Sequence, residues 1–511
     1  MTERDGAYTS VWQNVTAFTP KKFPDQKKFD VIIVGAGLTG IATALLLQKE
    51  GKKCLVLEAH TLGFGTSGGT TAHINTQMDT SYAMITRNFG LEHSRNVKRA
   101  VVDAFNLIRR QVEDYDIHCD YKLADAYLFA KEEKQNDDLK NIYDGCKAVG
   151  LGANITETLP LNIPHEHVMV MPDNARFHPL LYLQGLAREF EKAGGYILQE
   201  TRMQETEQHE DHLSIHTSGD TFETKALVYA THIPLGINVL HLRCAPWRSY
   251  ALAAELTDGD YPSDLYYDLD DPYHYYRSQI IDGKNYLIAG GEDHKTGEVT
   301  NTESCFLKLQ AHVRKYFNVK HVAYQWSSQY YESADGLAYI GHLPGGGDNV
   351  YVATGFGGNG MIYSHVSATV ISNLILLRDS FVNDLFTPSR IKPVAGFTNF
   401  VSHNAHVAKR FLEKFIPVES LEAFAGLAPN EGRVVSFEGE DLALFKNSDG
   451  KLYAVSPICP HMKCSVQWNQ AEQSWDCPCH GARYAVNGRV LNGPSTTNLE
   501  PVELRSLIEH H

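Results

Sequence analysis

The 511-residue sequence predicts a large α/β domain followed by a small all-β domain. Two observations carry this prediction. Near the N-terminus, an apolar run typical of a buried strand leads through a glycine-rich turn into an apolar helix. Near the C-terminus, short alternating strands precede two pairs of Cys and His residues on Pro-containing loops. A chain of this length suits two domains, each burying its own core.

Composition and charge exclude several function classes. The net charge is −15, and no basic footprint for nucleic acid or an anionic membrane is visible. The sequence contains no apolar run long enough to span a bilayer and no signal-peptide pattern in its first thirty residues, so we expect a cytoplasmic protein without a membrane span. Five of the nine cysteines (Cys54, Cys119, Cys146, Cys244 and Cys305) are scattered singly, as reduced thiols are.

The N-terminal region carries a dinucleotide-binding pattern. Phe29–Val34 reads as a strand, the turn G-A-G-L-T-G follows, and after a helix the second strand ends at Glu58. Gly35 permits the tight turn, Gly37 lets the backbone approach a pyrophosphate, and Gly40 allows close packing of helix on strand. Glu58 can hold a ribose hydroxyl. FAD and NAD share this pattern, so later segments must decide between them.

Three such segments favour FAD. Residues 62–73 form a small-residue loop able to lie against a flat ring system, and residues 226–231 read as a strand returning to the same sheet. Residues 335–361 contain a second glycine-rich turn, whose N–H groups could face the edge of a flavin. Together, residues 28–377 resemble the D-amino-acid-oxidase-like FAD family, which includes sarcosine, glycine and dimethylglycine oxidases and dehydrogenases. An NAD-binding domain without flavin is the alternative.

The residues expected to bind FAD lie in these glycine-rich and small-residue segments. They are Gly35, Gly37, Leu38, Thr39, Gly40, Glu58, Thr66, Ser67, Thr70, Thr71, His73, Thr231, Asp335, Gly336, Gly357, Gly358, Asn359, Gly360 and Met361. The run Gly69–His73 is also similar to the segment through which dimethylglycine and sarcosine dehydrogenases attach FAD covalently to a histidine. Ala72 replaces the aromatic residue of that segment, so covalent attachment, non-covalent contact and neither all stay open for His73.

Two insertions, about 81–172 and 234–322, interrupt the nucleotide-binding segments. In the resembling family the second insertion is an antiparallel sheet that covers the flavin and forms the substrate pocket. Its sequence here is rich in Tyr and His, which suits an aromatic pocket. The candidate pocket residues are Tyr250, His274, Tyr276 and Arg277, of which Arg277 could hold a substrate carboxylate in a bidentate pair. The alternative interpretation is that the tyrosines are ordinary strand-forming residues and that Arg277 is a surface charge.

The C-terminal region carries a metal-cluster pattern: Cys459-Pro-His461, fifteen residues, and then Cys477-Pro-Cys-His480. Two Cys and two His form the ligand set of a Rieske-type [2Fe–2S] cluster. A structural zinc site uses the same ligand types but needs neither the doubled Cys-Pro-Cys-His nor a second Cys after the first His.

Residues 456–464 and 475–484 resemble the two cluster-binding loops of Rieske proteins. The resemblance implies that His461 and His480 bind the outer iron, that Cys459 and Cys477 bind the inner one, and that Cys464 and Cys479 form a disulfide. Ala482 stands where high-potential Rieske proteins have Ser. Loss of that hydroxyl donor removes stabilisation of the reduced cluster, so we expect a lowered potential.

These patterns divide the chain into an N-terminal tail (1–27), an FAD-dependent oxidoreductase domain (28–378), a connector (379–417) and a Rieske domain (418–507). In fold-class terms, we expect an α/β FAD-binding Rossmann-type domain with an antiparallel β substrate domain, plus a small all-β Rieske domain.

The domain content narrows the function. The sequence shows one dinucleotide fingerprint, which argues against NAD(P)H as the reductant, and no domain for a mononuclear oxygenase iron. We expect flavin-dependent oxidation of an amine or amino-acid-like substrate, with electrons passed from FAD to the cluster and on to an external acceptor. The alternatives are an electron-transfer protein without its own small substrate and a flavin monooxygenase fed through the cluster. The sequence names neither the substrate, the redox partner nor the oligomeric state.

Overall fold

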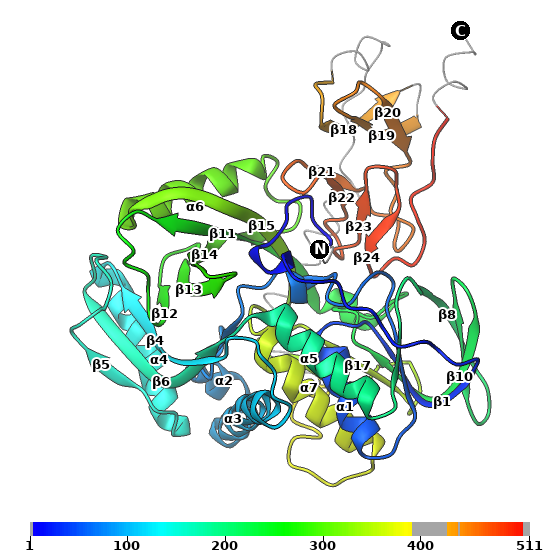
Figure 1. Cartoon of the computed structure of the whole chain (residues 1–511), viewed down its shortest axis with the longest axis horizontal. Coiled ribbons are helices and arrows are strands. Elements are labelled where there is room, and N and C mark those ends of the chain that lie inside the picture. The colour runs from blue at the N-terminus through cyan, green and yellow to red at the C-terminus, as the bar shows by residue number, and fades with distance from the viewer. Residues whose placement is uncertain (1–3, 391–426, 438–439, 504–511) are drawn as a thin grey trace.

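The computed structural model describes residues 4–390, 427–437 and 440–503 (Figure 1). Most of the expected connector (379–417) and residues 504–507 of the expected small domain lie outside these ranges. The domain boundaries therefore stay a prediction. None of the helices in the described ranges is long and apolar enough to cross a membrane.

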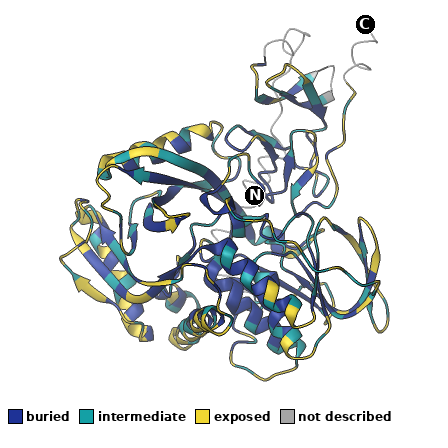
Figure 2. Ribbon diagram, in the orientation of Figure 1, coloured by how far each residue is buried: buried dark blue, intermediate teal, exposed yellow. Residues whose placement is uncertain are grey.

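The first sheet of the large domain is built around β1 (Lys28–Val34), as the apolar N-terminal run predicts. Its strands β10, β1, β2 and β7 are parallel neighbours, and β17 pairs parallel with β10 on the other side. Helices α1 and α7 pack together against it and are largely buried (Figures 1 and 2). The strands, in spatial order, are β16 (Tyr339–His342), β17 (Val350–Thr354), β10 (Thr221–Tyr229), β1, β2 (Cys54–Leu57) and β7 (Tyr196–Leu198); in addition, β9 (Leu213–Thr217) pairs with the first residues of β10, and β8 (Met203–Gln208) pairs with β9.

The second sheet of the large domain combines both expected insertions. Strands from residues 122–176 and from residues 244–333 meet where β12 pairs parallel with β4, and its other pairs are antiparallel. The strands, in spatial order, are β15 (Val319–Ser333), β11 (Cys244–Leu256), β14 (Lys284–Lys295), β13 (Tyr275–Ile281), β12 (Leu265–Asp268), β4 (Lys122–Ala130), β6 (His167–Arg176) and β3 (His73–Ile74), with β5 (Asn154–Thr156) beside β6.

Seven α-helices and four short 3₁₀ helices occur in the described ranges. Helix α6 covers one face of the second sheet, while α2, α3 and α4 pack together near its other end (Figure 1). The α-helices are α1 (Leu38–Lys49), α2 (Tyr82–Phe89), α3 (Leu91–Asp114), α4 (Asn136–Val149), α5 (Pro179–Lys192), α6 (Glu303–Tyr316) and α7 (Gly360–Ile375). The 3₁₀ helices are η1 (Val11–Gln13), η2 (Thr66–Gly68), η3 (Glu133–Gln135) and η4 (Val239–Leu242).

The small domain consists of two antiparallel sheets. One contains β18 (Glu431–Phe437), β19 (Glu440–Lys446) and β20 (Leu452–Val455). The other contains β21 (Gln467–Asn469), β22 (Ser474–Asp476), β23 (Arg483–Ala485) and β24 (Val490–Asn492). Trp475 and Tyr484 are fully buried in its core beside the four loop cysteines. The second of these sheets lies next to the large domain, as Figure 1 shows.

The segment expected as an N-terminal tail is ordered between the two domains. The Asp5 backbone N–H donates to the Phe64 carbonyl at 3.0 Å, and the Ala7 N–H donates to the Glu472 carboxylate at 2.8 Å. Trp12 is fully buried, and its indole N–H donates to the Thr70 carbonyl at 2.6 Å. Residues 4–13 therefore contact both the small-residue loop of the large domain and the small domain.

Candidate functional site

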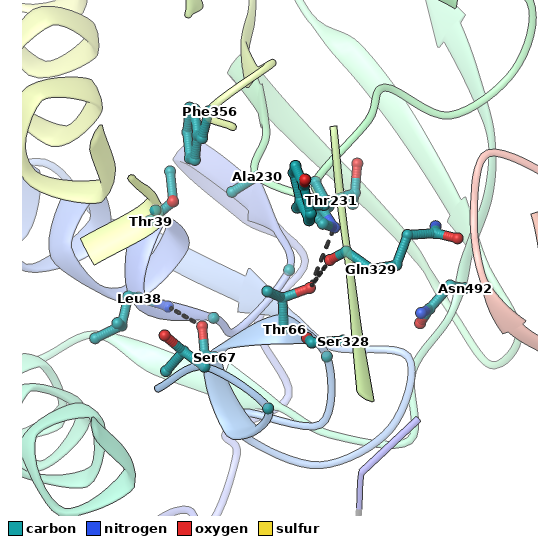
Figure 3. A pocket seen from close by; sticks show the side chains of 18 of the residues that line it. Leu38, Thr39, Thr66, Ser67, Ala230, Thr231, Ser328, Gln329, Phe356 and Asn492 are labelled. Atoms are coloured by element: carbon teal, nitrogen blue, oxygen red, sulfur yellow. Dashed lines mark hydrogen bonds between the residues drawn. The ribbon is translucent and has the colours of Figure 1, made fainter. Parts of the chain in front are cut away.

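A cavity of about 260 Å³ opens at the carboxyl ends of β1, β2 and β10 (Figure 3). In parallel sheets, this edge is where ligands bind. Gly35 has φ +107°, and a Cβ there would lie 2.5 Å from the Ala230 carbonyl oxygen. Gly37 precedes α1, whose first N–H, from Leu38, donates to Ser67 Oγ at 3.1 Å. The glycines thus leave room for a phosphate group at the N-terminus of α1.

Glu58 is held in place at the end of β2. Its carboxylate accepts hydrogen bonds from the Ala36 N–H at 2.8 Å and the His60 N–H at 2.9 Å. Burial raises the pKa of Glu58, although these two hydrogen bonds act to lower it. Because both bonds come from backbone, the carboxylate is oriented before any ligand binds, as a ribose partner needs to be.

Most of the expected FAD residues line this cavity, and some do not. Those that line it are Gly35, Gly37, Leu38, Thr39, Glu58, Thr66, Ser67, Thr70, Thr71, Thr231, Gly357, Gly358, Gly360 and Met361. Gly40, His73, Asp335, Gly336 and Asn359 are not among the lining residues.

The residues outside the lining have other contacts. Both carboxylate oxygens of Asp335 accept hydrogen bonds from Arg390, at 2.7 and 2.8 Å, so the side chain forms an ion pair within the protein and does not face the cavity. A Cβ on Gly40 would overlap the Gly35 carbonyl oxygen, which is a packing constraint of helix on turn. Asn359 exchanges two hydrogen bonds with Asp79, at 2.9 and 3.1 Å. A Cβ on Gly336, which has φ +86°, would lie 2.8 Å from Thr80.

His73 lies beside the cavity in a defined tautomer. Its Nδ1 is 2.5 Å from the Tyr267 hydroxyl, which itself donates to Asn75 Oδ1 at 2.8 Å. Since the Tyr267 proton is directed at Asn75, Nδ1 of His73 carries a proton and Nε2 carries the lone pair. That Nε2 is buried without a hydrogen-bond partner among the described residues. Burial lowers the pKa of His73 well below its usual range, so the ring is neutral. Covalent attachment of FAD here stays a prediction.

The candidate substrate residues do not face the cavity. Tyr250 and Tyr276 are fully buried in the cluster that packs on α6, where their hydroxyls meet His294 and His312 at 3.1 and 2.5 Å. His274 pairs with the Asp268 carboxylate at 3.3 Å. Side chains alternate between the two faces along a strand, so the neighbours of the expected residues face the cavity instead. Those neighbours, which sequence reasoning missed by one residue, are Ser249 and Tyr275, joined by Tyr330 from β15.

Arg277 is not placed to bind a substrate carboxylate. It is fully buried, and its guanidinium donates to the carbonyl oxygens of Ala72 at 2.6 Å and Phe177 at 3.3 Å. It also contacts the Gln279 side chain. The guanidinium therefore joins the small-residue loop (62–73) to the second sheet, and its hydrogen bonds are made to protein groups and not to the cavity.

The expected cluster residues come together at one end of the small domain. Cys459 and Cys477 are buried thiols, and a disulfide between Cys464 and Cys479 joins the two loops. The Tyr484 hydroxyl lies 3.1 Å from the Cys459 sulfur. The rings of His461 and His480 are 5.1 Å apart between centroids. Nδ1 of His461 is buried with no hydrogen-bond partner among the described residues. The two buried thiols, together with the Nδ1 of His461, fit a [2Fe–2S] cluster.

The cluster loops dock on the large domain through two segments. Nε2–H of His461 donates to the Gly236 carbonyl at 2.9 Å, and the His241 ring stands edge-on to both loop histidines, 4.5 Å from His461 and 5.7 Å from His480. From β15, the Tyr331 hydroxyl donates to the His480 carbonyl at 3.0 Å, and Gln329 donates to the Gly481 carbonyl at 2.8 Å. The histidine end of the small domain thus faces the large domain.

His241 is a neutral ring in this interface. Its Nδ1 accepts from the Asn238 N–H and its Nε2–H donates to the Pro234 carbonyl, each at 3.0 Å. Burial lowers its pKa to about 4. Both nitrogens are thus committed within its own loop, and the ring offers the loop histidines its carbon edge and face.

Comparison with known proteins agrees with this geometry. Residues 30–374 match the family described as FAD dependent oxidoreductase, and residues 420–503 match the Rieske [2Fe-2S] domain. YhfW of Bacillus subtilis (strain 168), whose name describes a Rieske 2Fe-2S iron-sulfur protein, is 31% identical over 477 residues, 93% of each chain. Gamma-glutamylputrescine oxidoreductase of Escherichia coli (strain K12) is 23% identical over 362 residues, 68% of this chain and 83% of that one. Glycine oxidase from Geobacillus kaustophilus shares the fold with a TM-score of 0.60 at 19% identity, covering 72% of this chain and all of that one.

Proposed function

Since the chain belongs to the family of FAD dependent oxidoreductases and carries a Rieske [2Fe–2S] domain, we propose that it oxidises an amine or amino-acid-like substrate and passes the electrons through the cluster to an external acceptor. The protein is an oxidoreductase, and its cofactors are FAD and the [2Fe–2S] cluster. FAD takes up two electrons with a hydride, whereas the cluster accepts and releases one at a time.

The observation that supports this function is that two chain segments each contact both sites. Residues 230–241 line the cavity through Ala230, Thr231, His232 and Leu235, and they contact the cluster loops through Gly236 and His241. Residues 328–331 line the cavity and bind the second cluster loop through Gln329 and Tyr331. Each segment spans only a few residues between its two contacts, so the two cofactors would be held close together.

The chain's own residues have separate roles in this proposal. Gly35, Gly37 and the first turn of α1 would hold the FAD diphosphate, and Glu58 would hold its ribose. Cys459, Cys477, His461 and His480 would bind the two irons. The second glycine-rich turn would bring the N-terminus of α7, at Gly360, toward the flavin, because the N–H groups of the three preceding residues already donate to Tyr331, Asp79 and Phe356.

The net reaction balances with a one-electron acceptor. For a primary amine, the protonated substrate and one water give an aldehyde and ammonium. Two electrons and two protons are released, and two molecules of the oxidised acceptor take the electrons. The bond broken is the C–H next to nitrogen, and hydrolysis then breaks the C–N bond.

Anaerobic rapid mixing of the holoenzyme with amines and amino acids tests the proposal. We expect the flavin absorbance to bleach first and the reduced-cluster EPR signal to follow at the same rate or more slowly. Bleaching that leaves the cluster oxidised would refute the electron route. If no compound bleaches the flavin but a reduced external donor reduces the cluster and then the flavin, the flow is reversed, as a monooxygenase needs.

A further inference from the structure

The second sheet turns a polar, aromatic face toward the cavity beyond the nucleotide-binding end. From β11, β13 and β15, the side chains of Ser249, Tyr275 and Tyr330 line the cavity. Asp293 of β14 lies among them: Ser249 Oγ donates to its Oδ1 at 2.5 Å, and the Tyr330 hydroxyl donates to its Oδ2 at 2.9 Å. The Tyr275 hydroxyl completes the chain with a 3.0 Å contact to Ser249 Oγ. One carboxylate is thus fixed by residues that contact the cavity.

Two more carboxylates border the same space. Asp79 accepts from the N–H of the cavity residue Gly358 at 2.8 Å. Glu332 follows Tyr330 by two residues on β15 and forms a backbone bridge with the cavity residue Phe356. Both side chains are accessible to water, yet burial raises the pKa of each carboxyl, that of Glu332 to about 7. The two carboxylates are thus exposed beside residues that line the cavity, and we call the space that they border the recess.

The three carboxylates act on one another electrostatically. Burial raises the pKa of Asp293 to about 7, and the negative charge of Asp79 contributes to this rise. Asp79 and Asp293 also raise the pKa of Glu332, while Lys295 lowers it. A cation bound among these carboxylates would favour their ionised forms. Two cations act on this group: Lys295, which lies 5.7 Å from the centre of the Trp247 ring, lowers the pKa of Glu332, and His274 lowers that of Asp293.

In the described part of the chain, no arginine lines the cavity near these carboxylates. Arg277 is committed to carbonyl oxygens, and Arg248 points to the other face of the sheet, toward Ser327 and Asp476. His73 is neutral. Among the residues that line the cavity, the one arginine is Arg202, which binds His60 at the nucleotide-binding end.

Aromatic rings complete the recess. Tyr273 and Tyr275 lie 5.6 Å apart between ring centroids, and Trp247 stacks on Tyr330 at 6.4 Å. Aromatic faces attract ammonium groups and repel carboxylates. The acidic and the aromatic side chains therefore both favour a ligand that carries ammonium groups.

We propose that the substrate is an aliphatic diamine or polyamine without a carboxylate, bound by Asp79, Asp293 and Glu332 and the surrounding tyrosines. This inference rests on the proposed function for the reaction, but the charge of the ligand follows from the recess alone. Two ammonium groups would favour the ionised forms of these carboxylates and pair with them, whereas an amino acid would bring a negative group into an acidic space.

Equilibrium binding to the anaerobic holoenzyme, followed by the change in flavin absorbance, tests the proposal. The probes carry no hydrogen on the nitrogen-bearing carbon and cannot be oxidised by hydride transfer: a dimethylhexanediamine with one methyl branch on each such carbon, tert-butylamine, and α-aminoisobutyrate. We expect the diamine to bind at least tenfold more tightly than the monoamine, and the amino acid more weakly than either. Because no electron moves, a failure of electron transfer does not affect this result.

Two variants locate the binding groups. Glu332→Gln and Asp293→Asn should each weaken diamine binding about tenfold and change monoamine binding less. Glu255→Gln is the matched control, because this carboxylate of β11 lies near Lys284 and Lys320 and away from the cavity. Retained flavin and cluster spectra show that a variant is folded. Equal affinity for diamine and amino acid, no spectral change with the diamine, or full diamine affinity in both variants would overturn the proposal.

Discussion

The ion pairs between the two domains give the most quantitative prediction. Arg483 is fully buried, and its guanidinium makes four hydrogen bonds: to Asp476 at 3.1 Å, to the Asp5 carbonyl and carboxylate at 2.9 and 3.0 Å, and to Ser474 at 3.1 Å. Arg483→Met keeps the apolar stem and removes all four bonds. It leaves two buried carboxylates short of a partner.

The magnitude follows from what remains. Removing one partner of a buried pair costs about 3–5 kcal/mol. Asp476 keeps Arg248 at 3.3 Å and Asn469 at 2.8 Å, and Asp5 keeps Arg4 at 3.4 Å. Because these partners persist, we expect the lower end, a loss of about 3 kcal/mol in the unfolding free energy of the small domain.

Urea unfolding followed by the visible circular dichroism of the cluster measures this loss, and flavin fluorescence reports the large domain separately. Arg433→Met is the matched control, since Arg433 is on β18 of the same domain and its pair with Glu431 is exposed. We expect a change below about 0.5 kcal/mol for the control. Equal losses in the two variants, or a loss below about 1 kcal/mol for Arg483→Met, would refute the assignment of this network as a main contributor to docking.

Three further predictions concern the cluster and its docking. Ala482→Ser should raise the cluster midpoint potential and Tyr484→Phe should lower it, because a hydroxyl near a cluster sulfur favours the reduced state; protein-film voltammetry measures both, and a shift of the opposite sign in either variant contradicts the reasoning. Tyr331→Phe removes the hydrogen bond to His480 and should slow cluster reduction several-fold, and more than it slows flavin bleaching, whereas Tyr339→Phe, at a buried tyrosine of the first sheet, should change neither rate in stopped-flow mixing. Burial raises the pKa values of Asp5 and Asp476, but the nearby arginines outweigh burial and hold both pKa values below the unfolded value of 3.8. The stability that these two ionised carboxylates provide is therefore present above pH 3.8 and is lost as the pH falls through their folded pKa values. Urea unfolding measures this loss, and an unfolding free energy of the small domain that stays constant below pH 3.8 would disprove it.

The nucleotide-binding end of the site could be predicted from the sequence because its signals are local. Gly35, Gly37 and Glu58 lie within one strand-turn-helix-strand unit, where spacing fixes the geometry. The cluster ligands could be predicted for the same reason, since each loop holds its cysteines and its histidine within a few sequence positions. The comparisons confirm both domain families.

The substrate side could not be predicted in the same way. Tyr250 and Tyr276 differ from Ser249 and Tyr275 by one position. Aromatic and polar residues occur on both faces of these strands, so the sequence gives no periodic signal to tell the cavity side from the α6 side. The prediction that Arg277 binds a substrate carboxylate rested on its residue type alone. Its actual partners, the carbonyls of Ala72 and Phe177, come from segments about one and two hundred residues earlier and follow only from the tertiary fold.

The ordered N-terminal segment has a consequence for biosynthesis. Asp5 is 478 positions from Arg483, its partner in the other domain. At about 5–20 residues per second, a ribosome adds Asp5 to the chain roughly 20–100 s before Arg483. Until translation is complete, residues 4–13 therefore have no small domain to bind, and their charged side chains stay in water. Docking of the two domains is thus among the last events of folding. A tag fused to the first residues would therefore affect the interface between the two domains.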